Sequence, residues 1–272
     1  MGSITMTLQH TTLGSTELKI STVGLGTTKL GRNTDVKYPH SFEIPDDKQV
    51  LNLLAMAQDL NINLIDTAPA YGASEERLGK LLQGQRQKWV IVGKAGEDYD
   101  NQESSYNFTK EHIIDSIQRS LKRLRTDYID LLLIHSDGDD ENIINNYDVF
   151  GTLSLAKKQG LIRYYGMSTK TVAGGLLTLK HSDAAMIMYN PINTEELPVI
   201  TAAHEMRKGI LIKKALASGH INKINSSNPV QTAMDFIFKE PGISSVILGT
   251  INPQHLKTNV QCVLNSFNIN ND

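Results

Sequence analysis

The chain has 272 residues, a formal net charge of −2, 40% hydrophobic residues and 21% charged residues. This near-neutral balance offers no electrostatic basis for binding nucleic acid or a membrane surface, and no apolar run approaches the roughly 18 residues of a spanning helix. We therefore expect a cytoplasmic globular protein with neither nucleic-acid nor membrane partners. The one cysteine, Cys262, lies in an apolar helical pattern, which predicts a small core residue in a reducing compartment.

The predicted elements begin with a β-hairpin over residues 11–21, where polar and apolar residues alternate and Gly14 favours a turn. Short apolar runs then predict eight strands, over residues 21–27, 63–68, 89–95, 128–136, 161–168, 184–190, 209–216 and 244–250. Amphipathic patterns between these runs predict helices, and Pro229 stands where a helix start favours proline. Segments 97–108 and 217–228 are predicted to be long loops.

Eight strand–helix units predict an α/β fold, a (β/α)8 TIM barrel with a short N-terminal β-hairpin. A doubly wound open sheet is the alternative, but "GLGTTKLG" (24–31) lacks the G-x-G-x-x-G loop that would favour it. No linker rich in Pro, Gly or Ser divides the chain, so residues 1–272 are expected to form a single domain.

Polar residues that can take part in acid–base chemistry follow three successive predicted strands. Asp66 and Tyr71 follow the second strand, Lys94 ends the third and His135 ends the fourth. The carboxyl ends of barrel strands face the active site, so these four side chains should converge. Asp66 can supply the counter-charge that a lysine in a dry barrel mouth requires. A cation beside Tyr71 is expected to lower the phenol pKa from about 10, which would suit proton transfer.

Each of these residues also has a purely structural interpretation. Asp66 and Lys94 could form an ion pair with no role in chemistry, His135 could be a satisfied rim residue, and Tyr71 could only pack. Their combination at three successive strand ends favours a site that protonates an oxygen while a hydride reaches carbon.

Five segments together resemble the aldo-keto reductase family, and the resemblance runs from Leu13 to about Phe267. The first is "GLGTTKLG" (24–31), which resembles the family's first-strand motif. The other four are "LIDTAPAYGASEERLGKLL" (64–82), "VIVGK" (90–94), "SLKRLRTDYIDLLLIHS" (120–136) and "GLIRYYGMST" (160–169). The resemblance implies a barrel with an extended nicotinamide cofactor at the strand ends and hydride transfer to a carbonyl carbon. It implies Tyr71 as the acid, Lys94 and Asp66 as its supports, and His135 as the residue that orients the carbonyl.

The resemblance also implies a set of cofactor-binding residues and no metal. The set comprises Gly26, Thr27, Thr28, Asp66, Ser168, Thr169, Lys213, Leu216, Ser218, Gly249, Thr250, His255 and Asn259. The chain departs from the family pattern at several of these places. Thr169 replaces an asparagine, Met186 stands where the family often has a glutamine, and Lys213 replaces a stacking aromatic. Alternation predicts that either Lys213 or Lys214 points into the barrel.

The adenosine end bears on cofactor choice. Gly249 and His255 stand where NADP-preferring members commonly carry Lys or Arg, and neutral histidine binds a 2′-phosphate poorly. Thr250, Asn252 and the helix start near Pro253 are expected to be able to hold an anion. We expect NADP(H), with NAD(H) possible.

The expected substrate is a small aldehyde or ketone, in a pocket shaped by the loops at 28–45, 96–108 and 217–228. Two other functions stay open at this point. One is a nucleotide-sensing regulatory subunit without turnover, and the other is an NAD-dependent sugar or alcohol dehydrogenase. The expected assembly is a monomer or a weak homo-oligomer.

Overall fold

A computed structural model describes residues 7–269 of the chain, and within them eight parallel strands close into a barrel. The strands follow one another around the barrel in the order β10-β11-β12-β3-β4-β5-β8-β9. Their bounds are β3 Val23–Gly26, β4 Leu64–Asp66, β5 Val90–Ala95, β8 Ile129–His135, β9 Ile162–Ser168, β10 Ala184–Met188, β11 Gly209–Lys213 and β12 Ile243–Leu248. The predicted (β/α)8 barrel is confirmed, with each predicted strand in its place.

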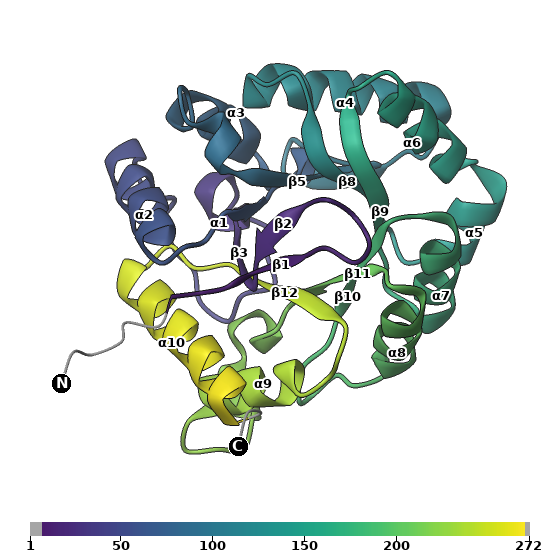
Figure 1. Cartoon of the computed structure of the whole chain (residues 1–272). Coiled ribbons are helices and arrows are strands. Elements are labelled where there is room, and N and C mark those ends of the chain that lie inside the picture. The colour runs from purple at the N-terminus through teal and green to yellow at the C-terminus, as the bar shows by residue number, and fades with distance from the viewer. Residues whose placement is uncertain (1–6, 270–272) are drawn as a thin grey trace.

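Helices surround the barrel, as Figure 1 shows. They are α2 (Asp47–Asp59), α3 (Ser74–Leu81), α4 (Lys110–Leu124), α6 (Val149–Lys158), α7 (Val172–His181), α8 (Leu197–Met206), α9 (Pro229–Phe238) and α10 (Pro253–Ile269). Two shorter helices, α1 (Thr28–Gly31) and α5 (Asp140–Asn146), follow β3 and β8. Pro229 is the first residue of α9, and the Asn228 side chain accepts a hydrogen bond from the Gln231 amide there. The predicted core residue Cys262 is buried in α10.

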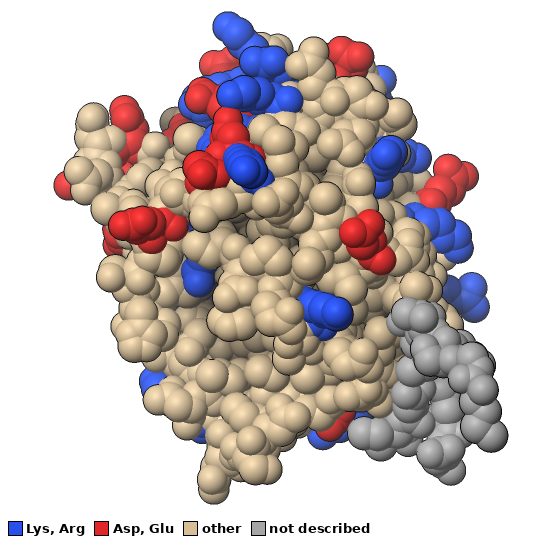
Figure 2. Space-filling model, turned by 90° about the vertical axis from the view of Figure 1, so that its left-hand side faces the viewer, with Lys and Arg blue, Asp and Glu red and all other residues tan. Residues whose placement is uncertain are grey.

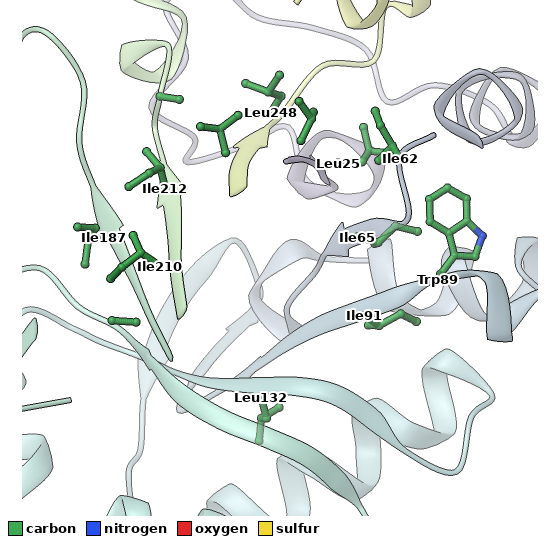
Figure 3. Close-up of a cluster of buried hydrophobic side chains, with 14 of the residues drawn as sticks. Leu25, Ile62, Ile65, Trp89, Ile91, Leu132, Ile187, Ile210, Ile212 and Leu248 are labelled. Atoms are coloured by element: carbon green, nitrogen blue, oxygen red, sulfur yellow. The ribbon is translucent and has the colours of Figure 1, made fainter. Parts of the chain in front are cut away.

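The strands bury both faces because side chains alternate between the barrel interior and the helix layer. Outward-pointing residues such as Leu25, Ile65, Ile91 and Leu132 belong to the core beneath the helices (Figure 3). The inward-pointing residues form a separate apolar cluster that includes Leu64, Val92, Leu131, Leu133, Met186 and Leu211. Strands buried on both faces explain why the sequence shows continuous apolar runs.

The predicted N-terminal hairpin is present and seals one end of the barrel. Strand β1 (His10–Thr12) pairs antiparallel with β2 (Lys19–Ser21). Leu13, Leu18 and Ile20 belong to the same apolar cluster as the inward-pointing strand residues. The hairpin lies across the barrel in Figure 1. The opposite end, where the parallel strands terminate, is therefore the end available for a site.

The segment 97–108, predicted to be a long loop, contains a second hairpin instead. Strands β6 (Glu97–Asp100) and β7 (Glu103–Tyr106) pair antiparallel across a turn in which Asn101 and Gln102 have φ of 49° and 68°. The predicted loop at 217–228 holds two short 3-10 turns, η3 (Ala217–Gly219) and η4 (Ile221–Lys223). Both segments are polar and lack apolar alternation, so the pattern of residues concealed this structure.

Charged side chains on the face drawn in Figure 2 gather near its upper edge, with acidic and basic residues mixed. Most of that face carries no charged side chain. Within residues 7–269, no helix has the length and apolar character needed to cross a membrane.

Candidate active site

The four predicted catalytic residues meet at the carboxyl ends of neighbouring strands. Asp66 ends β4, Lys94 is the penultimate residue of β5, and His135 ends β8. Tyr71 lies on η1 (Pro69–Tyr71), the 3-10 turn that directly follows β4. Parallel pairing of β4 with β5 and of β5 with β8 brings these ends together.

Lys94 and Asp66 form a buried ion pair. Lys94 Nζ donates to Asp66 Oδ1 and also to the Thr67 carbonyl oxygen at 3.2 Å. Burial alone would lower the pKa of Lys94, but the Asp66 carboxylate and Tyr71 together raise it above its ordinary value. The ammonium therefore stays charged beneath the site.

Tyr71 lies against this pair. Its hydroxyl donates to Asp66 Oδ2 at 3.4 Å, and Lys94 Nζ lies 4.8 Å from the centre of its ring. Lys94 lowers the phenol pKa, as the sequence suggested. Burial and the Asp66 carboxylate outweigh it and raise the Tyr71 pKa to about 12. The net lowering expected from the sequence is therefore wrong, because it ignored the loss of solvent around the phenol.

His135 faces Tyr71 and is held from behind by an acid that the sequence analysis missed. The two rings meet edge to face with centroids 6.3 Å apart. His135 Nδ1 lies 2.8 Å from Glu97 Oε2, and Ser104 Oγ donates to Glu97 Oε1 at 2.8 Å. Burial alone would raise the Glu97 pKa, but His135 and Ser104 lower it to about 2. An acid three residues after Lys94 was the available sequence signal, but only the β6–β7 hairpin turns it toward His135.

A second group of predicted residues lies beside His135 at the ends of β9 and β11. Lys213 Nζ donates to Ser168 Oγ at 2.9 Å and to the Thr169 carbonyl oxygen at 2.6 Å. Ser168 pairs in register with His135, so this group adjoins the four residues above. Lys213 is thus the inward member of the Lys213–Lys214 pair, and burial lowers its pKa.

The residues present fit a carboxamide at this position. Thr169 Oγ1 is buried and has no hydrogen-bond partner among the described residues. Such an orphaned hydroxyl is costly unless a ligand satisfies it. Met186 belongs to the apolar cluster inside the barrel, so it replaces the amide of a glutamine with a packing group. A nicotinamide here would be held by Ser168, Thr169 and Lys213.

The remaining predicted cofactor residues lie around β3 and β12. Gly26 ends β3 beside Gly249, whose backbone lies about 3.5 Å from where a Gly26 side chain would begin. The Thr27 hydroxyl is fully buried and donates to the Asp66 carbonyl oxygen at 2.8 Å, so it links β3 to β4. Thr28 begins α1, while Leu216 and Ser218 lie in the turns after β11. This arrangement puts Gly26 and Thr28 at the barrel mouth and ties the Thr27 side chain to the fold.

The start of α10 is capped by the chain itself. Asn252 Oδ1 accepts from the Gln254 and His255 amides at 2.9 Å and 3.3 Å, while the Asn252 amide donates to Thr250 Oγ1 at 3.1 Å. These amides are therefore already satisfied, which reduces what the helix start can offer a phosphate. His255 is exposed and Asn259 is largely buried.

A large open hollow of about 850 Å³ lies elsewhere. Residues of the β1–β2 turn, of the end of α6 and of the start of β9 line it, among them Glu17, Lys157 and Tyr164. It contains none of the predicted site residues, and Lys157 in it already lies 3.4 Å from Asp183. Size alone does not make it the site; the converging titratable groups lie at the other end of the barrel.

Comparisons with known proteins agree with the fold. The family model described as "Aldo/keto reductase family" matches residues 22–192, well over half of the chain. A solved structure from Pseudomonas aeruginosa, described as an aldo-keto reductase, is 48% identical in sequence to this chain. The match covers 98% of this chain and 100% of that one, with a TM-score of 0.88. The chain belongs to the aldo-keto reductase family, and it is an NAD(P)H-dependent oxidoreductase.

Two curated relatives are more distant. The oxidoreductase YqkF of Bacillus subtilis is 27% identical over 92% of this chain and 89% of its own length. D-threo-aldose 1-dehydrogenase of a Pseudomonas species is 28% identical over 76% of this chain and 71% of its own length. Family membership implies reduction of a small-molecule carbonyl with a nicotinamide cofactor, and it leaves the substrate and the choice of cofactor to be argued.

Proposed function

We propose that the protein reduces the carbonyl group of a small aldehyde or ketone with NADPH, using Tyr71 as the proton donor. The observation that carries this proposal is the cluster of Tyr71, Lys94 and Asp66 beside His135 at the open end of the barrel. A phenol whose pKa is raised to about 12 stays protonated at neutral pH, as a proton donor must.

The chain's residues divide the work of the reaction. The bound nicotinamide would supply a hydride to the carbonyl carbon, held at its carboxamide by Ser168, Thr169 and Lys213. Tyr71 gives its hydroxyl proton to the carbonyl oxygen as negative charge develops there. Lys94, kept cationic by Asp66, then stabilises the phenolate that remains until a proton returns from solvent. Asp66 and Lys94 therefore act through Tyr71.

The choice between NADPH and NADH turns on the adenosine end of the site. Family membership favours NADPH in our proposal. A second candidate, NAD-dependent oxidation of a sugar or alcohol, is favoured by the uncharged Gly249 and by the capped amides of α10. The similarity to an aldose dehydrogenase supports the same candidate. Gly249 and His255 offer no fixed guanidinium fork for a 2′-phosphate, and this separates the two candidates.

To test the proposal, the purified protein is mixed with a panel of aldehydes, sugars and alcohols and with each of the four nicotinamide cofactors in turn. The absorbance of the cofactor reports turnover. We expect NADPH oxidation with small aldehydes and at least a tenfold preference over NADH, about 1.4 kcal/mol. Reduction of NAD by sugars, with little NADPH oxidation, would replace the proposal with the second candidate. No turnover with any combination would contradict both.

A further inference from the structure

A buried guanidinium group lies beside the turn that carries Tyr71. Arg32 directly follows α1, and its side chain keeps only 8% of its exposure. Its acidic partner is Asp35, at 2.7 Å, but the Asp35 side chain is 67% exposed. Burying a charged side chain is unfavourable, and an ion pair with an exposed carboxylate offsets little of that penalty. Other contacts must explain why Arg32 is buried.

The guanidinium group makes five hydrogen bonds. Nε donates to the Thr34 carbonyl oxygen at 3.1 Å, and Nη2 donates to the carbonyl and carboxylate oxygens of Asp35 at 2.9 Å and 2.7 Å. Nη1 donates to the Ala70 carbonyl oxygen at 3.0 Å and to Ser104 Oγ at 3.5 Å. Because an arginine side chain has five N–H donors in a rigid planar fork, these bonds fix the neighbours of Arg32 relative to one another.

The contacts of Arg32 join three parts of the barrel mouth. Its acceptors belong to the segment after α1, to η1 and to β7. The Tyr99 ring of β6 adds a cation–π contact, with its centre 3.6 Å from Arg32 Cζ. The hydroxyl groups of Tyr99 and Thr34 meet at 2.6 Å, which ties the same segment to the hairpin a second time. The guanidinium group is therefore the centre of a junction between the α1 segment, η1 and the β6–β7 hairpin.

The bond to Ala70 is the one that bears on the chemistry, because Ala70 directly precedes Tyr71. The turn η1 is three residues long, and the Tyr71 amide donates to the Ala68 carbonyl oxygen at 3.0 Å. So short a 3-10 turn gains little stability from its own backbone. Gly31 supports it as well, since a side chain at Gly31 would begin only 2.4 Å from the Tyr71 carbonyl oxygen. Gly31 and Arg32 together hold the turn in place.

We propose that Arg32 is a positioning residue that holds the turn bearing Tyr71, so that the phenol proton is delivered to the substrate carbonyl oxygen. The Tyr71 hydroxyl reaches Asp66 Oδ2 only at 3.4 Å, so the placement of the ring depends on the backbone of the turn. A displacement of about 1 Å at a reacting group lowers a rate by about 100-fold. Arg32 acts through Tyr71, and the inference rests on the proposed role of Tyr71 as the acid.

A double-mutant cycle tests whether Arg32 acts through Tyr71. The quantity measured is the single-turnover rate of NADPH oxidation with the best aldehyde of the panel. Arg32→Met removes all the donors and should lower this rate by about tenfold to 100-fold. In the Tyr71→Phe background the same change should lower it less than about twofold, because no proton donor is left to position. Losses of equal size in the two backgrounds would overturn the proposal.

Two further variants separate placement of the turn from charge and from folding. Arg32→Lys keeps the charge but has no planar fork, so its rate should lie within about threefold of the Arg32→Met rate. Full activity in Arg32→Lys would overturn the proposal. Where Arg32→Met does not fold, Arg32→Gln, which keeps two donors, enters the same cycle.

The matched control is a second arginine that binds the same segment. The Arg77 guanidinium group donates to the carbonyl oxygens of Leu30 and Pro45 and pairs with Asp47 at 2.9 Å. None of its hydrogen bonds within the described residues goes to η1. Arg77→Met should lower the unfolding free energy and leave the single-turnover rate unchanged. A fall in rate equal to that of Arg32→Met would mean that any lost guanidinium group has this effect, and would overturn the proposal.

Carbon NMR of protein labelled at tyrosine Cζ follows Tyr71 without any turnover. The chain has 9 tyrosines, so the Tyr71 resonance is assigned by its loss in Tyr71→Phe. We expect this resonance to shift or broaden in Arg32→Met and to stay unchanged in Arg77→Met. An unchanged resonance in Arg32→Met overturns the inference whatever the kinetics show. A shifted resonance in a protein that turns over no aldehyde overturns the proposed reaction and supports the hold of Arg32 on the turn.

Discussion

At the scale of single residues, the site is built around charges that cannot be removed one at a time. Lys94 and Asp66 keep only 1% and 5% of their side-chain exposure, so each is the other's main source of charge compensation. A buried ion pair adds little net stability over apolar residues, but a buried charge left without its partner is expensive. The pair is thus better explained by what it does to Tyr71 than by the stability of the barrel.

This asymmetry makes a stability prediction. Lys94→Met leaves Asp66 buried without its partner and should cost about 3–5 kcal/mol of unfolding free energy in urea denaturation. The double variant Lys94→Met/Asp66→Asn should recover part of that loss, because neither charge remains. Lys80, whose ion pair with Asp47 lies at the surface, provides the control, and Lys80→Met should change the unfolding free energy little. Equal losses in the single and double variants would contradict the pairing.

Glu97 makes a prediction about pH. Its pKa is about 2 in the folded protein and 4.5 is the ordinary value, so the unfolded chain binds more protons between these limits. The stabilisation from its contacts is therefore complete above pH 4.5 and lost as the pH falls toward 2. Urea denaturation of the native protein and Glu97→Gln should show a difference in stability that shrinks over this window. A difference that is constant from pH 6 to pH 3 would exclude these contacts as its source.

At the scale of elements, the strands of the barrel could be predicted from the sequence and the β6–β7 hairpin could not. Strands such as β5 and β8 are buried on both faces, so they appear as continuous apolar runs that stand out in the sequence. The β6–β7 hairpin has the polar sequences EDYD and ESSY, and its Asn101–Gln102 turn lacks the glycine that usually marks such turns. The two strands pair through backbone hydrogen bonds, and the pattern of residues does not predict them.

We expect substitutions in the N-terminal hairpin to change the unfolding free energy without changing the turnover number. Leu18 is 2% exposed and packs in the cluster inside the barrel, at the end away from the site. Leu18→Ala should lower the unfolding free energy by about 2–5 kcal/mol through the cavity it leaves. The turnover number below the unfolding transition should stay unchanged. Leu51→Ala, at an exposed position on α2, is the matched control and should alter neither quantity. A fall in turnover for folded Leu18→Ala would show that the two ends communicate.

At the scale of the whole molecule, the fold places the chemistry at one end of the barrel and the seal at the other. Asp66, Lys94 and His135 could be identified in the sequence because they directly end apolar runs in a fold whose strand ends face the site. Contacts between distant elements could not be identified. Glu97 against His135 and Lys213 against Ser168 depend on the closure of the ring and on a hairpin outside it. The net pKa of Tyr71 depends on burial, which only the folded chain defines.

The most direct test of the account is a single-turnover experiment on Tyr71→Phe. Protein in excess over NADPH is mixed with the best aldehyde from the panel, and NADPH affinity is measured separately by fluorescence titration. The account predicts a dissociation constant within about twofold of the native value, because only one hydroxyl is lost. It predicts a rate lower by about 10²–10⁴-fold, the usual contribution of a positioned proton donor. A rate close to that of the native protein would contradict the assignment of Tyr71 as the acid.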